Sequence, residues 1–121
     1  MEKKVNLGHV LVLEDEPFIS LDMEQMLREC GAAMVTTFGT RTEALAWLNR
    51  NQPDVAVVDP RLSDGVCADV VERLLAEDVP LVICSGASID DPAFQRGAWL
   101  DKPTTPDALR DTLKGICKSK M

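Results

Sequence analysis

A continuous apolar run of four residues, Val55 to Val58, constrains the fold of this chain more than any other feature. Its length and its valine content are typical of a strand that is buried on both faces of a parallel sheet. Asp59 and Pro60 follow directly, so the run ends in a carboxylate. A charged group where a buried strand reaches the surface is costly unless other groups pair with it. We therefore expect the rest of the chain to supply partners for Asp59.

Further short apolar runs share this pattern, and amphipathic segments separate them. The runs are Val10–Leu13, Ala33–Phe38, Leu81–Cys84 and Ala98–Leu100. The intervening segments carry apolar residues at helical spacing, and Thr40 to Glu43 matches a capping box. Strands that alternate with helices in this way predict an α/β fold with a doubly wound, five-stranded parallel sheet.

The segment before the last strand is too short for a regular helix. Sixteen residues lie between Ser85 and Lys102, and the loop and the fifth strand use most of them. Asp91 is expected to cap a helix and Gly97 to end it, which leaves Pro92 to Arg96 for the helix itself. This length is little more than one turn, so we predict a shortened fourth helix with high mobility.

The length and composition of the chain indicate one acidic globular domain. The chain has 121 residues, 45% of them hydrophobic, and a net charge of -7. We expect a single domain over residues 1–121, with no fused output domain. The acidic balance argues against nucleic acid as a partner, because phosphate binding needs a basic surface. No apolar run is long enough for a signal peptide or a membrane span, which predicts a cytoplasmic protein without membrane insertion. The four cysteines form no CxxC pair, so we expect free thiols.

Polar residues follow four of the five predicted strands. Parallel strands end at the same edge of a sheet, where ligands bind in open α/β folds. Several carboxylates at one edge favour Mg²⁺, and a lysine and a hydroxyl nearby could hold a phosphoryl group on an aspartate. The residues are Glu14, Asp15 and Glu16 after the first strand, Asp59 after the third, Ser85 after the fourth and Lys102 after the fifth.

This order of residues resembles the receiver domains of two-component response regulators, over about residues 9 to 117. The resemblance implies a flavodoxin-like sheet with strand order 2-1-3-4-5. It also implies that Asp59 accepts a phosphoryl group, in a Mg²⁺-dependent reaction, from a histidine kinase or a histidine phosphotransfer protein. The surface would then change for a downstream protein target, which the sequence does not name. Such a receiver is not a conventional enzyme, because it catalyses only its own phosphorylation and dephosphorylation.

The resemblance also assigns roles to the metal ligands. Asp15 and Asp59 would bind Mg²⁺ directly, and Glu14 would act through a water molecule. The backbone carbonyl of Arg61 would add a further ligand. The chain departs from the usual pattern in having Glu14 where the family more often has aspartate, and in having Pro60 directly after the acceptor.

Further roles implied by the resemblance concern catalysis and switching. Lys102 and Ser85 would contact the phosphoryl group, and Ser85 and Trp99 would form the switch that changes the surface. Trp99 stands where the family usually has tyrosine or phenylalanine. The peptide bond between Lys102 and Pro103 would be cis.

Three alternative functions are a phosphatase, a cofactor binder and a receiver without an output. A small phosphatase with an aspartyl nucleophile, as in haloacid-dehalogenase-like enzymes, needs a second aspartate where this chain has Arg61. A flavodoxin-like cofactor binder needs a glycine-rich loop after the first strand, where this chain is acidic. A receiver that only drains phosphate from a shared relay, with no output of its own, stays open.

Overall fold

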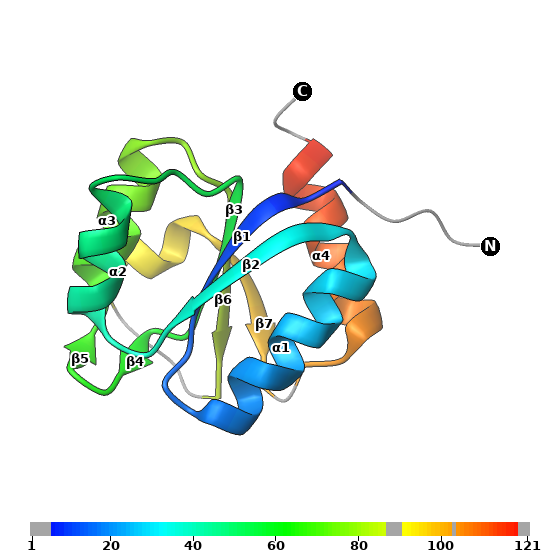
Figure 1. The fold of residues 1–121 in the computed structure, drawn as a ribbon, viewed down its shortest axis with the longest axis horizontal. Helices are drawn as coiled ribbons and strands as arrows, with labels where there is room; N and C mark the ends of the chain where they lie inside the picture. The colour runs from blue at the N-terminus through cyan, green and yellow to red at the C-terminus, as the bar shows by residue number, and fades with distance from the viewer. Residues whose placement is uncertain (1–5, 87–90, 103, 119–121) are drawn as a thin grey trace.

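A five-stranded parallel sheet forms the centre of the protein (Figure 1). The computed structural model describes residues 6–86, 91–102 and 104–118, with residues 117 and 118 described by their backbone alone. The strand order is β2-β1-β3-β6-β7, which is the predicted order 2-1-3-4-5 once the hairpin strands β4 and β5 are set aside. The sheet strands are β1 (Gly8–Leu13), β2 (Ala32–Phe38), β3 (Val55–Val58), β6 (Leu81–Ser85) and β7 (Ala98–Asp101). The predicted fold class is therefore confirmed.

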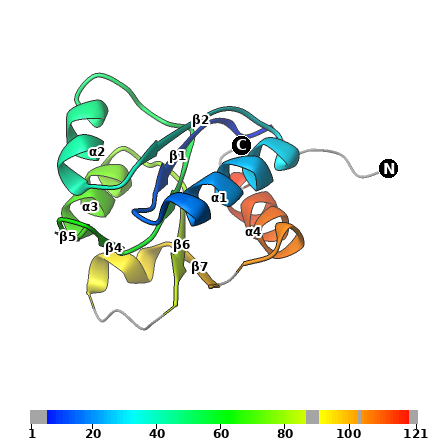
Figure 2. The same cartoon turned by 60° about the horizontal axis from the view of Figure 1, so that its bottom comes forward.

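Helices cover both faces of this sheet. Figure 2 shows α1 and α4 on one side, and α2, α3 and the yellow turn η1 on the other. None of the helices in the described ranges is both long and apolar enough to cross a membrane. The bounds are α1 (Pro17–Cys30), α2 (Arg41–Leu48), α3 (Ala68–Ala76), η1 (Pro92–Arg96) and α4 (Pro106–Lys118).

The central strands are buried on both faces, as their continuous apolar runs predict. Val10 and Val12 of β1 pack toward α1 and α4, whereas Leu11 and Leu13 pack toward α2, α3 and η1. This alternation follows from the period of two residues in a strand. Both layers of the core meet at β1 and β3, so the carboxyl ends of these strands are held in fixed positions.

The segment between β6 and β7 contains a short turn in place of a regular helix. Pro92–Arg96 forms a single 3₁₀ helix, and the Asp91 side chain accepts a hydrogen bond from the Ala93 amide at 3.0 Å. Phe94 is fully buried and anchors the turn in the core. The predicted shortening of the fourth helix is confirmed, whereas its mobility stays a prediction.

The loop after β3 contains a small hairpin. Ser63 and Asp64 form its turn, and its strands are β4 (Arg61–Leu62) and β5 (Gly65–Val66). Gly65 has a φ of 121°, a conformation that a side chain would disfavour. The hairpin was missed because strands of two residues carry too little periodicity to recognise.

The described cysteine side chains are free and buried, as expected. Burial raises the pKa of the Cys67 thiol to about 12, and that of Cys84 to the same value. These thiols therefore stay protonated and unreactive at neutral pH. The side chain of Cys117 lies outside the described residues.

Candidate functional site

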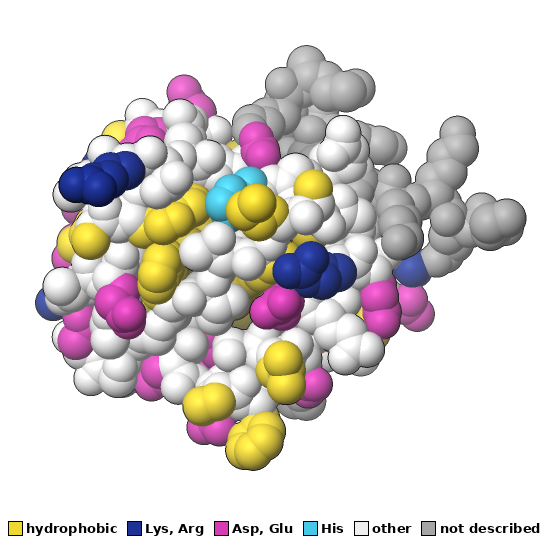
Figure 3. Space-filling model, viewed as in Figure 1, with side chains coloured by type: hydrophobic (Ala, Val, Ile, Leu, Met, Phe, Trp, Pro, Cys, Tyr) yellow, Lys and Arg dark blue, Asp and Glu magenta, His cyan; other side chains and the backbone are white. Residues whose placement is uncertain are grey.

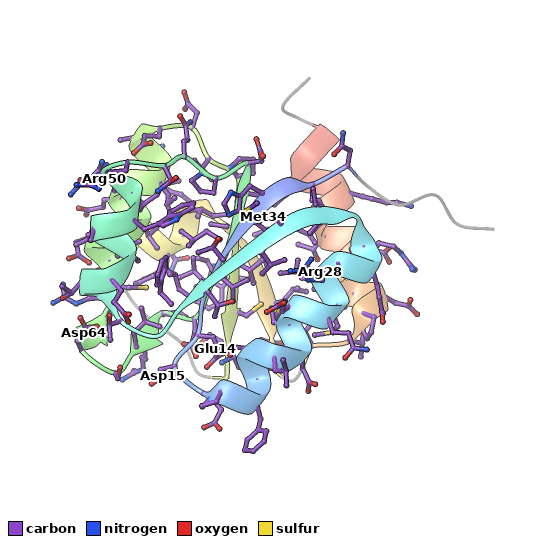
Figure 4. All side chains as sticks on the ribbon, viewed as in Figure 1. Glu14, Asp15, Arg28, Met34, Arg50 and Asp64 are labelled. Atoms are coloured by element: carbon purple, nitrogen blue, oxygen red, sulfur yellow. The ribbon has the colours of Figure 1, made fainter. Side chains whose placement is uncertain are left out.

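The ends of β1, β3, β6 and β7 lie next to one another at one edge of the sheet. The Asp59 amide donates a hydrogen bond to the Leu13 carbonyl at 2.8 Å, and the Lys102 amide donates to the Ser85 carbonyl at 3.1 Å. Figure 4 shows Glu14 and Asp15 at this edge, below the end of β1. The backbone thus brings the predicted site residues to one place.

Lys102 joins two of the carboxylates at this edge. Its Nζ atom lies 2.6 Å from Glu14 Oε1 and 2.6 Å from Asp59 Oδ2. Burial alone lowers the pKa of Lys102, but the hydrogen bonds to Asp59 and Glu14 outweigh it, so the pKa is raised. The Lys102 side chain therefore stays an ammonium ion at neutral pH. This positive charge is what a group that stabilises negative charge must carry.

The carboxylates of Glu14, Asp15 and Asp59 form a compact acidic cluster. One oxygen of each lies within 4.8 Å of the others. Glu14 is buried, Asp59 is half-buried and Asp15 is exposed. A single ammonium cannot balance three carboxylates, and oxygen ligands of this kind suit Mg²⁺ with several retained waters. The donor set therefore fits a magnesium ion.

Glu16 is not part of this cluster. It lies at the N-cap position of α1, but its side chain makes no capping hydrogen bond. Its backbone amide instead donates to Glu14 Oε2 at 3.1 Å. Glu14 therefore has one oxygen held by Glu16 and the other by Lys102, which orients the carboxylate without a metal.

The loop after β3 contributes a backbone donor to the site. The Arg61 amide donates to Asp59 Oδ1 at 3.0 Å, while Lys102 occupies Oδ2. The Arg61 side chain is exposed, and Pro60 is buried beneath the loop. Both oxygens of the Asp59 carboxylate are therefore oriented by protein donors.

The two predicted switch residues occupy different surroundings. Ser85 ends β6 and is 8% exposed, next to Lys102 through the backbone bond between them. Trp99 is half-buried against the core layer that contains Phe94, and its Nε1 atom donates to the Phe94 carbonyl at 2.8 Å. The structure thus attaches Trp99 to η1. Pro103, and with it the predicted cis peptide, lies outside the described residues.

Sequence reasoning missed the residues that hold the loop after β3. The side chain of Asp64 accepts hydrogen bonds from Arg41 and Thr42 at the start of α2. The capping box at residues 40–43 and the Asp64–Gly65 turn are visible in the sequence. Their spacing of 23 residues gives no sign that they meet.

Comparison with known proteins connects this geometry to one family. The family model described as "Response regulator receiver domain" matches residues 10–114. The transcriptional regulatory protein PdtaR of Mycobacterium tuberculosis is 32% identical over 100 residues, which cover 78% of this chain and 49% of PdtaR. The phyllosphere-induced regulator PhyR of Methylorubrum extorquens is 33% identical over 76 residues, covering 60% of this chain and 28% of PhyR. The chain thus spans half or less of the length of these relatives.

Solved structures share the fold. The solution structure of SdrG from Sphingomonas melonis Fr1 has a TM-score of 0.78 and 31% identity, and the match covers 93% of this chain and 98% of that one. The receiver domain of the sensor histidine kinase PA1611 from Pseudomonas aeruginosa PAO1, with a magnesium ion coordinated in its active site cleft, has a TM-score of 0.78 at 23% identity. That match covers 91% of this chain and 97% of the other.

Proposed function

The chain belongs to the response regulator receiver domain family, and from this premise we propose that it is a phosphorelay receiver with Asp59 as the acceptor. The observation that carries the proposal is the pair of contacts from Lys102 to Asp59 and Glu14, beside the acidic cluster. A fixed ammonium, a nucleophilic carboxylate and a cation site are the parts that phosphoryl transfer to aspartate needs. We further propose that one receiver domain accounts for residues 1–121, and that it works in the cytoplasm.

Magnesium is the proposed cofactor. Asp15 and Asp59 would bind it directly, Glu14 would act through water, and the Arg61 carbonyl would complete the protein ligands. The compact cluster of carboxylate oxygens supports this assignment. When bound, the ion would neutralise charge on the phosphoryl oxygens during transfer.

The proposed reaction moves a phosphoryl group from a histidine to Asp59. An oxygen of the Asp59 carboxylate attacks phosphorus, the P–N bond to the donor imidazole breaks, and the imidazole leaves with the electron pair. Lys102 would move from the carboxylate to a phosphoryl oxygen, and Ser85 would donate to another. Hydrolysis by water would later return Asp59 to a carboxylate with release of inorganic phosphate.

The start of α1 offers a contact surface for the donor beside this edge. Phe18, Ile19 and Leu21 are 79%, 38% and 65% exposed. Figure 3 shows apolar side chains protruding at the lower edge, over the start of α1. Ile19 also lines a cavity of about 340 Å³, together with Met23, Cys84 and Lys102. A histidine kinase or phosphotransfer protein must cover this edge to reach Asp59, and we propose that these apolar side chains contact it.

Intact-mass measurement tests the acceptor. A small phosphodonor such as acetyl phosphate, with Mg²⁺, should add one phosphoryl group to the wild-type protein and none to Asp59→Asn. The control is Asp54→Asn, because Asp54 precedes the same strand at the opposite edge of the sheet. The control should be modified like the wild type. Undiminished modification of Asp59→Asn would contradict the proposal.

A further inference from the structure

The segment that follows Asp59 is a small hairpin with little stability of its own. Strands β4 and β5 pair through only Arg61 with Val66 and Leu62 with Gly65. The base is closed by the Cys67 amide, which donates to the Pro60 carbonyl at 2.9 Å. Isolated two-stranded hairpins are marginal in water, even when they are longer than this one. Contacts outside the hairpin must therefore decide how firmly it is held.

Asp64 at the hairpin tip makes several contacts of this kind, in addition to the burial of Leu62 in the core. Its Oδ1 accepts from the Arg41 amide at 2.7 Å, and its Oδ2 accepts from the Thr42 amide and hydroxyl at 3.2 and 3.1 Å. These are the first two amides of α2, which lack partners within the helix. The cap residue Thr40 accepts from Glu43 instead. Asp64 thus completes the capping of α2 from another part of the chain, with charge-assisted bonds.

Further contacts made by Arg41 and Ser63 strengthen the attachment. The Arg41 side chain donates to the Asp64 carbonyl at 3.3 Å and forms an ion pair with Asp69 of α3 at 2.6 Å. The Ser63 amide and hydroxyl both donate to the Gly39 carbonyl, at 3.3 and 3.0 Å. The tip is therefore bonded to Gly39, Arg41 and Thr42, within residues 39–42 where β2 leads into α2.

The same junction lies against the acidic pair. A Cβ atom placed on Gly39 would lie 3.4 Å from the Cα of Asp15, so the two backbones are in contact. At the other end of the hairpin, the Arg61 amide holds Asp59 Oδ1. A continuous path of contacts thus runs from Asp15 through residues 39–42 and Asp64 to Asp59. Figure 4 shows Glu14, Asp15 and Asp64 in the lower left part of the molecule.

We propose that Asp64 is a positioning residue for the cation site, because it sets the Asp59 loop at a fixed place relative to Asp15. The inference rests on the proposed function, in which these two carboxylates share a magnesium ion. Without the Asp64 side chain the hairpin keeps the bonds from Ser63 to Gly39 but loses those to the amides of Arg41 and Thr42, so it is held less firmly and the Asp59 loop must be reordered when the ion binds. Substitution of residues that orient metal ligands indirectly typically weakens metal binding by about 10- to 100-fold.

The test is calorimetric titration of the purified protein with MgCl₂. Asp64→Ala should weaken Mg²⁺ binding about tenfold. Asp64→Asn, which keeps the shape but loses the charge, should show a smaller loss in the same direction. With a phosphodonor and saturating Mg²⁺, both variants should still be modified at Asp59. The matched control is Asp54→Ala, because Asp54 also accepts a distant backbone amide, that of His9 at 2.8 Å, but at the opposite edge of the sheet. Its Mg²⁺ affinity should equal that of the wild type.

The outcomes separate the inference from the function. If Asp64→Ala and Asp64→Asn bind Mg²⁺ as tightly as the wild type, Asp64 has only a structural role and the inference is wrong. An equal loss in Asp54→Ala would also overturn it, because the effect would then follow general stability. Failure of the wild type to bind Mg²⁺ would instead contradict the proposed function, and the inference with it.

Discussion

The surroundings of Asp64 favour the charged form of its carboxylate. The backbone hydrogen bond from Arg41 lowers its pKa from the ordinary value of 3.8, and the contacts with Thr42 act in the same direction. Burial opposes them but is the weaker effect. A depressed pKa in the folded protein means that the charged form stabilises the fold.

The pH dependence of stability follows from the sign of this shift. Asp64 contributes its stability fully above its unfolded pKa, near 3.8, and loses it as pH falls through the lower folded value. The wild-type protein should therefore have a higher free energy of unfolding than Asp64→Asn at pH 7. This difference in unfolding free energy should become smaller as pH falls below about 3.8. Urea unfolding of both proteins at pH 7 and pH 3 measures this. A gap that stays constant over this range would contradict the assignment of Asp64 as a charged cap.

At the scale of single elements, η1 depends on Trp99. Five residues of 3₁₀ helix have little intrinsic stability, and their geometry is poorer than that of an α-helix. The Trp99 indole donates to the carbonyl of Phe94, whose side chain is fully buried at the centre of the turn. The bond therefore attaches the turn to β7, the strand that leads to Lys102.

Trp99→Phe should loosen this turn. Phenylalanine keeps an aromatic ring but leaves the Phe94 carbonyl without its donor, a loss of about 1–3 kcal/mol in unfolding free energy. The Phe94 amide, which bonds to the Asp91 carbonyl, should exchange with deuterium faster than in the wild type. The control is Trp47→Phe, because Trp47 lies in α2 and its ring contacts those of His9 and Phe38. Unchanged exchange at Phe94 in Trp99→Phe would show that the indole does not hold the turn.

The contrast between η1 and the β4–β5 hairpin shows what a sequence can predict at this scale. The short turn follows from counting: the residues between Ser85 and Lys102 do not suffice for a longer helix once a strand is placed. The hairpin contact does not follow from counting. Whether Asp64 reaches α2 depends on the direction in which two short strands leave Asp59, and local propensity does not determine that direction.

For the whole molecule, topology explains why most of the site could be anticipated. Every strand of a parallel sheet with right-handed crossovers ends at the same edge, so polar residues after the apolar runs must meet there. Lys102 illustrates this, because it forms ion pairs with Glu14, 88 residues away in the sequence, and with Asp59, 43 residues away. The roles of these residues in phosphoryl transfer stay predictions.

The same topology does not specify which partners bind the molecule. The acidic net charge of -7 and the apolar start of α1 favour a donor with a basic and partly apolar surface. The match to the family model over residues 10–114 establishes the family, whereas the identity of the donor depends on the side chains of another protein.

The claim that Asp59 carries an acyl phosphate is tested most directly by chemical mapping. Protein treated with acetyl phosphate and Mg²⁺ is reduced with borohydride, which converts an aspartyl phosphate to homoserine, and is then digested with trypsin. The account predicts homoserine at position 59 in the peptide of residues 51–61, only when both phosphodonor and Mg²⁺ were present. Homoserine at Asp15 or Asp54 instead, or none anywhere in the wild-type protein, would contradict it.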